Sequence, residues 1–329
     1  MYTLLGEEQL KSGESLEIGV VAAPDAEFAP AITTLLVHKE PMWQIHMTAA
    51  LQGRASLLET RFHVGFIGGA PVANVMTAEH LGVGFLGHVF TAPEHRRKGI
   101  CQAIMRRVME HFRERGGRVL LLGTGFESPP YWIYHSFGFR SVKRGFMRYD
   151  SPAAGDFEQS WFVPGAVSAA PFAWEHWPLV GLLGARNGGP YLRSALWRLY
   201  GAANLEGPAA RLLAAQAEGA GTNGAVLRST SGAVVGCATI HPTGGGINGW
   251  PGVWLLDAFT HSNFHSYLGE LLGALKWPSE KIIAYVEAGD VDKARALEDY
   301  GLEREGTLRE FLRSDDLARD AWLYGKTIK

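Results

Sequence analysis

Three consecutive cations, Arg96, Arg97 and Lys98, stand directly before Gly99 in this sequence. In residues 100–112 the apolar side chains recur at helical spacing, so a helix is predicted to begin just after the glycine. A helix N-terminus presents N–H groups without acceptors, and a glycine lets the backbone approach a ligand closely. The stretch therefore predicts a binding site for a multiply charged phosphate, although the basic triplet alone would also fit a solvated loop.

Two apolar runs must position this basic turn. Residues 83–89 precede it and residues 119–124 follow the predicted helix, and both runs are typical of buried strands. A loop with two prolines then leads to Tyr134, which is followed by the segment Phe137-Gly138-Phe139. The chain thus has the order strand, Arg-x-x-Gly-x-small, helix, strand, Tyr-x-x-x-Gly-Phe.

This order of motifs resembles the acetyl-CoA-dependent N-acetyltransferases of the GNAT superfamily, and the match covers roughly residues 60–145. The resemblance implies an α/β fold with a mixed α+β sheet and flanking helices, and acetyl-CoA as the cosubstrate. It places acetyl-CoA in a splayed gap between the strand that ends near Thr91 and the strand that ends near Thr124. The cofactor-binding residues that it implies are Val89, Phe90, Thr91, Arg96, Arg97, Lys98, Gly99, Ile100 and Cys101.

Cys101 departs from the family pattern, which usually has Gly or Ala at this position. Its N–H remains available to a phosphate, but the thiol adds bulk beside it. We do not expect a catalytic cysteine, because the position belongs to the phosphate end of the cofactor.

The resemblance also assigns the catalytic chemistry. The acceptor amine attacks the thioester directly, and Tyr134 would protonate the departing thiolate; the alternative is a core aromatic beside the following turn. An alkyl ammonium has a pKa of about 10.4, so the attacking amine needs a base or a water chain at neutral pH. Glu127, in the loop before Tyr134, is the first candidate base and His88 is the second, and each could instead be a hydrogen-bonded wall residue.

Composition limits the class of protein. The 329 residues suggest two domains, the 47% hydrophobic content fits a globular core, and the net charge of −2 implies no general affinity for nucleic acid. The two cysteines, Cys101 and Cys237, cannot form a disulfide framework, and the N-terminus lacks the features of a signal peptide. We therefore expect a cytoplasmic protein without a membrane partner; the oligomeric state is left open.

The second half of the chain echoes the first. Residues 252–260 resemble residues 82–91, and residues 297–302 resemble residues 134–139, although strand–helix–strand units can share such patterns by chance. With a linker at residues 151–156, this predicts two tandem GNAT-like acyltransferase domains: a catalytic domain at 1–150 and a degenerate copy at 156–329.

The second copy lacks the chemistry of the first. No cation or early glycine stands at residues 262–268, and Leu297 stands opposite Tyr134. A structural role, or a role as a wall of the acceptor pocket, is expected. We predict no metal site, because His261 and His265 have i, i+4 spacing but no further ligands nearby.

The sequence thus favours an N-acetyltransferase that acts on a primary amine of a small molecule. One alternative is a transferase that uses another acyl-CoA or an unusual acceptor in a biosynthetic pathway; the tandem architecture resembles that of mycothiol synthases, but their acceptor residues have no match here. A further alternative is a non-catalytic acyl-CoA-binding module.

Overall fold

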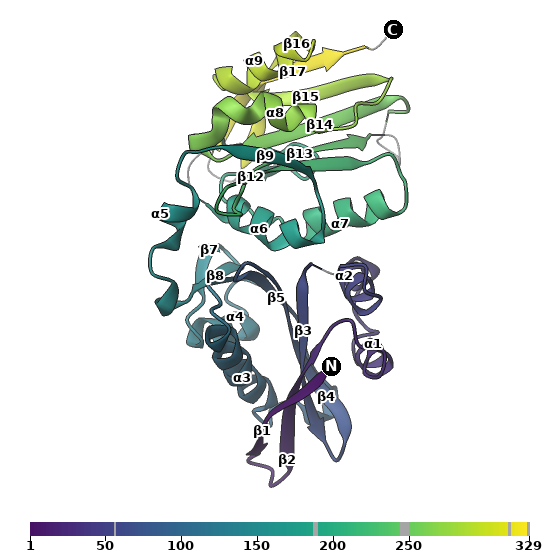
Figure 1. The fold of residues 1–329 in the computed structure, drawn as a ribbon, viewed down its shortest axis with the longest axis vertical. Helices are drawn as coiled ribbons and strands as arrows, with labels where there is room; N and C mark the ends of the chain where they lie inside the picture. The colour runs from purple at the N-terminus through teal and green to yellow at the C-terminus, as the bar shows by residue number, and fades with distance from the viewer. Residues whose placement is uncertain (56, 187–189, 244–249, 315–316, 328–329) are drawn as a thin grey trace. The chain divides into compact units, whose positions relative to one another are not determined.

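The computed structural model describes residues 1–55, 57–186, 190–243, 250–314 and 317–327. The chain divides into two compact units (Figure 1). The first unit comprises Met1–Gly155 together with Trp177–Gly181, and the second comprises Asp156–His176 and Leu182–Lys329. Within the described residues, no helix combines the length and the apolarity needed to cross a membrane.

The first unit is built on an eight-stranded mixed sheet with the strand order β1-β2-β3-β4-β5-β6-β8-β7. Only β5 and β6 run parallel, and all other neighbours are antiparallel. The strands are β1 (Tyr2–Gln9), β2 (Ser15–Ala22), β3 (Glu59–Ile67), β4 (Ala70–His80), β5 (Val83–Thr91), β6 (Val119–Gly123), β7 (Arg140–Lys143) and β8 (Phe146–Asp150).

Helices cover both faces of this sheet. Helices α1 (Ala29–Leu35) and α2 (Pro41–Leu51) lie on one face, and α3 (Ile100–Glu114) and α4 (Pro129–Ser136) lie on the other (Figure 1). Ile104, Val108 and Phe112 recur at helical spacing in α3 and are 0% exposed, so the predicted helix after Gly99 is confirmed. They share one core cluster with Tyr134 of α4 and with residues of β2, β4, β5 and β6.

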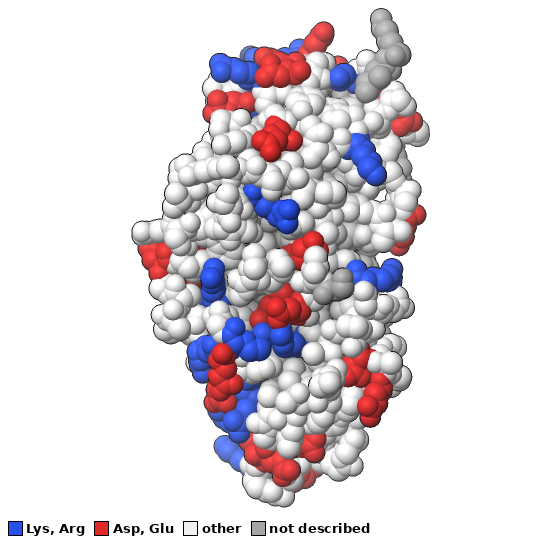
Figure 2. All heavy atoms as spheres, viewed as in Figure 1, with Lys and Arg blue, Asp and Glu red and all other residues white. Residues whose placement is uncertain are grey.

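The surface over α3 carries much of the positive charge on the face drawn in Figure 2, with carboxylates among the cations. Arg106 Nη1 donates to Glu8 at 2.8 Å, and Arg107 pairs with Glu110 at 3.2 Å. The charges of Arg106 and Arg107 are therefore paired within the unit.

The second unit contains a seven-stranded sheet with the order β9-β12-β13-β14-β15-β17-β16. This is the order β2-β3-β4-β5-β6-β8-β7 of the first unit. Among the described strands, the fourth and fifth in this order, β14 and β15, are parallel, as β5 and β6 are in the first unit. The strands are β9 (Val167–Pro171), β12 (Asn223–Ser229), β13 (Val234–Pro242), β14 (Val253–Thr260), β15 (Lys281–Glu287), β16 (Glu303–Ser314) and β17 (Leu317–Lys326).

The remaining elements of the second unit are helices and one small hairpin. The helices are α5 (Phe157–Trp161), α6 (Trp177–Ala185), α7 (Glu206–Ala217), α8 (Leu268–Gly273) and α9 (Val291–Asp299). The first residues of α6, Trp177–Gly181, are grouped with the first unit. The hairpin is formed by β10 (Leu192–Ser194) and β11 (Leu199–Tyr200).

Candidate active site

The central feature of the first unit is the divergence of β5 and β6. The parallel pairing ends at Phe85 and Leu121, but β5 continues to Thr91. On its other side, β5 stays paired with β4 through a bulge, in which His88 and Val89 stand opposite one residue of β4. His88 has a φ of 48°, in the left-handed region that glycine usually occupies in a bulge. The end of β5 therefore has one paired edge and one open edge that faces away from β4.

The hydrogen bonds of β5 show which groups point to this open edge. Ala92 N donates to Val72 O at 2.8 Å, so the backbone of Ala92 is directed toward β4. Because successive residues of a strand alternate in direction, the carbonyls of Val89 and Thr91 point to the open edge. There Lys39 Nζ donates to Val89 O at 3.3 Å, and Arg96 Nε donates to Thr91 O at 3.0 Å.

The basic turn leads from β5 into α3. Gly99 is the residue before the helix and has a φ of 87°, which favours glycine, and a Cβ there would meet no atom within 4 Å. The first helical bond is donated by Ala103 to Gly99 O at 3.0 Å. The N–H groups of Ile100, Cys101 and Gln102 precede that bond and are available to an anion.

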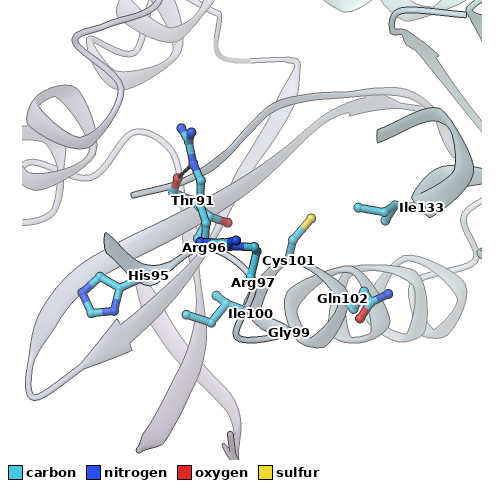
Figure 3. Close-up of a pocket in the computed structure, with 9 residues that line it drawn as sticks. All are labelled: Thr91, His95, Arg96, Arg97, Gly99, Ile100, Cys101, Gln102 and Ile133. Carbon is cyan, nitrogen blue, oxygen red and sulfur yellow. Dashed lines mark hydrogen bonds between the residues drawn. The ribbon is translucent and has the colours of Figure 1, made fainter. Parts of the chain in front are cut away.

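A cavity of about 340 Å³ lies at this turn (Figure 3). Arg96, Arg97 and Cys101 stand at the start of α3, and Ile133 of α4 lies across from them (Figure 3). The lining residues are Thr91, His95, Arg96, Arg97, Gly99, Ile100, Cys101, Gln102 and Ile133. Burial raises the pKa of the Cys101 thiol, so this side chain lines the cavity as a neutral group.

Three of the predicted cofactor-binding residues do not line this cavity. Lys98 Nζ forms an ion pair with Glu14 at 2.8 Å, in the turn between β1 and β2, and is not among the residues that line the cavity. Val89 and Phe90 lie along β5, outside the lining set. Of these two residues, Val89 directs its carbonyl to the open edge of the strand, whereas Phe90 is paired with Asn74 of β4.

Sequence reasoning missed other residues of this region. Ile133 reaches the cavity from α4, and Lys39 reaches β5 from the connection between α1 and α2. The sequence offered one signal for Ile133, its position next to Tyr134, and none for Lys39.

Tyr134 lies on the helix that supplies one wall of the cavity. Its side chain is 7% exposed and belongs to the core cluster around α3. The ring packs edge-on against Phe139, with 6.1 Å between centroids. Its backbone carbonyl accepts the N–H groups of Phe137 and Phe139, at 3.0 and 3.2 Å, and so closes the C-terminus of α4.

The two candidate bases have different surroundings. Glu127 is exposed in the loop before α4 and has a φ of 55°. His88 lies at the bulge beside Val89, and burial, with a smaller effect of the Lys39 charge, lowers its pKa to about 4. The imidazole of His88 is therefore neutral at physiological pH, whereas Glu127 lies in water.

Residues 59–142 match the family model described as an acetyltransferase (GNAT) domain. This match covers β3 to β7 and includes the open edge of β5, the basic turn and Tyr134, so the candidate site lies within the segment that is similar to GNAT acetyltransferase domains. The mixed sheet of the first unit confirms the predicted α/β fold, and the matched segment agrees with the predicted resemblance to GNAT acetyltransferases.

Among curated relatives, the chain is similar to N-acetyltransferase 8 from Homo sapiens, with 33% identity over 85 residues. The aligned part is 26% of this chain and 37% of that relative, so the chain spans well under half the length of the relative that it matches.

Solved structures of acetyltransferases are similar over about half of the chain. An N-acetyltransferase from Staphylococcus aureus Mu50 is 15% identical, with a TM-score of 0.39 over 50% of this chain and 100% of that chain. A ribosomal-protein-alanine N-acetyltransferase from Brucella melitensis is 19% identical, with a TM-score of 0.37 over 48% of this chain and 98% of that chain. A phosphinothricin acetyltransferase from Sinorhizobium meliloti, in complex with AcCoA, is 13% identical, with a TM-score of 0.37 over 50% of this chain and 89% of that chain.

Proposed function

We propose that the first unit transfers an acetyl group from acetyl-CoA to a primary amine of a small molecule. The main support for this proposal is that the open edge of β5 and the cavity at the start of α3 adjoin each other within the segment that matches GNAT domains. The open edge of β5 leads directly into the cavity at the start of α3, where Arg96 and Arg97 surround free N–H groups.

The residues present fit acetyl-CoA. Gly99 leaves open space above the backbone, and the N–H groups of Ile100 to Gln102 can hold a pyrophosphate beside the two arginines. The amide-rich pantetheine arm can bond to the open edge of β5, as an added strand would. For this, Arg96 and Lys39 must release the carbonyls of Thr91 and Val89 to which they donate.

The transfer needs no nucleophile from the enzyme. The amine attacks the thioester carbonyl, the C–S bond breaks, and Tyr134 supplies a proton to the departing sulfur. Positioning of the amine and stabilisation of the developing oxyanion supply much of the rate. A test is the release of CoA thiol on mixing the protein with acetyl-CoA and a panel of amines. Tight binding of acetyl-CoA without thiol release from any amine would reduce the unit to a binding module.

His88 is the candidate base closer to the open edge of β5, and its low pKa gives a prediction about stability. In the unfolded chain its pKa is about 6.5, and in the folded protein it is about 4. The unfolded state therefore binds an extra proton as the pH falls below 6.5, so the stability contributed by neutral His88 is lost between about pH 6.5 and pH 4.

Denaturant unfolding at pH 7 and pH 5 measures this effect. We expect His88→Gln to lose less stability between the two pH values than the natural chain does. The buried His63 remains in both proteins and serves as the internal reference. An unchanged pH dependence in His88→Gln would contradict the lowered pKa of His88 in the folded protein.

We further propose that the second unit is a degenerate copy of the first. The shared strand order supports this, and so do the C-termini of α4 and α9. Leu297 O accepts from Tyr300 N at 3.1 Å and Leu302 N at 3.0 Å, as Tyr134 O accepts from Phe137 N and Phe139 N. Leu297 therefore takes the place of the catalytic tyrosine in this copy.

The chain itself bridges β14 and β15 where their pairing ends. Asp257 on β14 accepts hydrogen bonds from Ser194 Oγ at 2.6 Å and Ala195 N at 2.8 Å. Glu287 at the end of β15 accepts from Tyr191 N at 3.0 Å. The segment around the β10–β11 hairpin thus forms hydrogen bonds with β14 and β15 at the position that corresponds to the open edge of β5.

This arrangement predicts one acetyl-CoA per chain. Calorimetric titration of the full chain should give a single site, because the second unit has neither the basic turn nor an unoccupied strand end. Two equivalent sites would show that the second copy has kept its cofactor site.

A further inference from the structure

The connection between α1 and α2 lies against the end of β5. The ring of His38 packs on Phe90 with 4.0 Å between centroids, and Lys39 Nζ reaches the Val89 carbonyl. Gln44 of α2 holds this connection in place, because its Nε2 donates to Lys39 O at 2.6 Å and to Val37 O at 3.2 Å. The backbone of Lys39 is therefore fixed beside the open edge.

The ammonium group of Lys39 is partly buried and lacks a counter-ion. The carbonyl of Val89 is its recorded partner, and no carboxylate lies within ion-pair distance of it in the part of the chain that the structure describes. Burial lowers the pKa of Lys39, and no acidic group opposes this shift. A partly desolvated cation with one neutral acceptor is an incomplete arrangement, which an anionic group of a ligand would complete.

The position on β5 that Lys39 contacts indicates which of the two substrates would supply the anionic group. The proposed phosphate-binding turn follows Thr91, the last residue of β5. Lys39 donates its hydrogen bond to Val89, which lies two residues before Thr91 in the same strand. Val89 lies toward the point at which β5 and β6 begin to diverge, after Phe85. In the proposed function, the phosphates of the cofactor lie at the turn and the reacting thioester lies toward the divergence. An anion at Lys39 therefore belongs to the acceptor.

We propose that Lys39 binds a carboxylate of the acceptor, so that the substrates are amines that carry a carboxylate, as amino acids do. This rests on the proposed acetyltransferase function. The single charge of Lys39 matches the single charge of a carboxylate. The positive charge of Lys39 also lowers the pKa of a nearby attacking amine, because two like charges repel each other. A larger fraction of the amine is then neutral and able to react.

The test uses pairs of amines that differ in the carboxylate: L-phenylalanine with 2-phenylethylamine, and β-alanine with ethylamine. The rate of CoA thiol release at saturating acetyl-CoA gives kcat/KM for each amine. The natural chain should prefer the carboxylate-bearing member of a pair by at least about 10-fold, the effect expected of one charged hydrogen bond. Lys39→Met should remove this preference, Lys39→Arg should keep part of it, and Lys11→Met, at an exposed position in the turn after β1, should leave it unchanged.

Two results would overturn the proposal: a natural chain that prefers the neutral amines, or a Lys39→Met variant that keeps the preference. Calorimetry should show that Lys39→Met binds acetyl-CoA at least as tightly as the natural chain, because no ammonium then competes for the Val89 carbonyl, and this binding shows that the variant is folded. If acetyl-CoA binds but no amine reacts, the transferase function fails. In that case, the affinity for N-acetyl-L-phenylalanine in the presence of CoA tests whether Lys39 binds a carboxylate. Equal affinity in the natural chain and in Lys39→Met would refute this role.

Discussion

Replacing Tyr134 by Phe should lower kcat by roughly 10²–10⁴, with the KM for acetyl-CoA nearly unchanged. The ring and its contact with Phe139 remain in this variant, so the core around α3 and α4 is preserved. Only the hydroxyl that would protonate the departing thiolate is lost. Tyr131→Phe is the matched control, because Tyr131 lies on the same helix, is equally buried at 7% exposure, and has no role in the proposed chemistry.

The pH dependence of the defect tests the assigned role. A thiol has a pKa of about 8.5, so the CoA thiolate leaves without help more readily as the pH rises. The difference between Tyr134→Phe and the natural chain should therefore shrink between pH 7 and about pH 9. The measurement is a pH–rate profile of both proteins with one amine. A variant that retains the full rate across this range would remove Tyr134 from the mechanism.

Replacing Arg96 and Arg97 together by Ala should weaken acetyl-CoA binding by roughly 10²–10⁴-fold. Both side chains line the cavity at the start of α3, and a hydrogen bond to a charged group contributes about 1.5–3 kcal/mol. Lys98→Ala is the contrasting variant. Its ammonium pairs with Glu14, so its loss should change affinity much less. The sequence alone grouped Lys98 with the arginines, and the structure separates them.

Calorimetry at two salt concentrations measures both effects. The natural chain should lose affinity as salt rises, because exposed charges are screened, and the double variant should lose less. An equal loss in Lys98→Ala and in the double variant would show that the three cations act only through the general field of the turn. No loss in the double variant would contradict the phosphate site.

The residues that the sequence placed correctly lie in one contiguous strand–turn–helix segment. Gly99 requires a positive φ, the apolar spacing of α3 requires a buried face, and both follow from local geometry. Gly68 and Gly69, with positive φ, likewise turn β3 into β4, at the hairpin that a glycine pair indicates. Such features are legible in a sequence because the residues that determine them are neighbours along the chain.

Tertiary structure alone decided which distant residues meet at this segment. Lys98 pairs with Glu14, which is 84 residues away, and Lys39 meets Val89 across 50 residues. The strand β1, which places Glu14, was not predicted, because it is an edge strand in which exposed and half-buried residues mix without a clear apolar pattern. Hydrophobic periodicity determines which face of an element is buried, but the partner of a polar side chain depends on how loops of many residues bring elements together. The sequence by itself therefore determined the resemblance to GNAT acetyltransferases and the glycine turn before α3, whereas the contact of Lys39 with β5 and the pairing of Lys98 follow from the folded sheet.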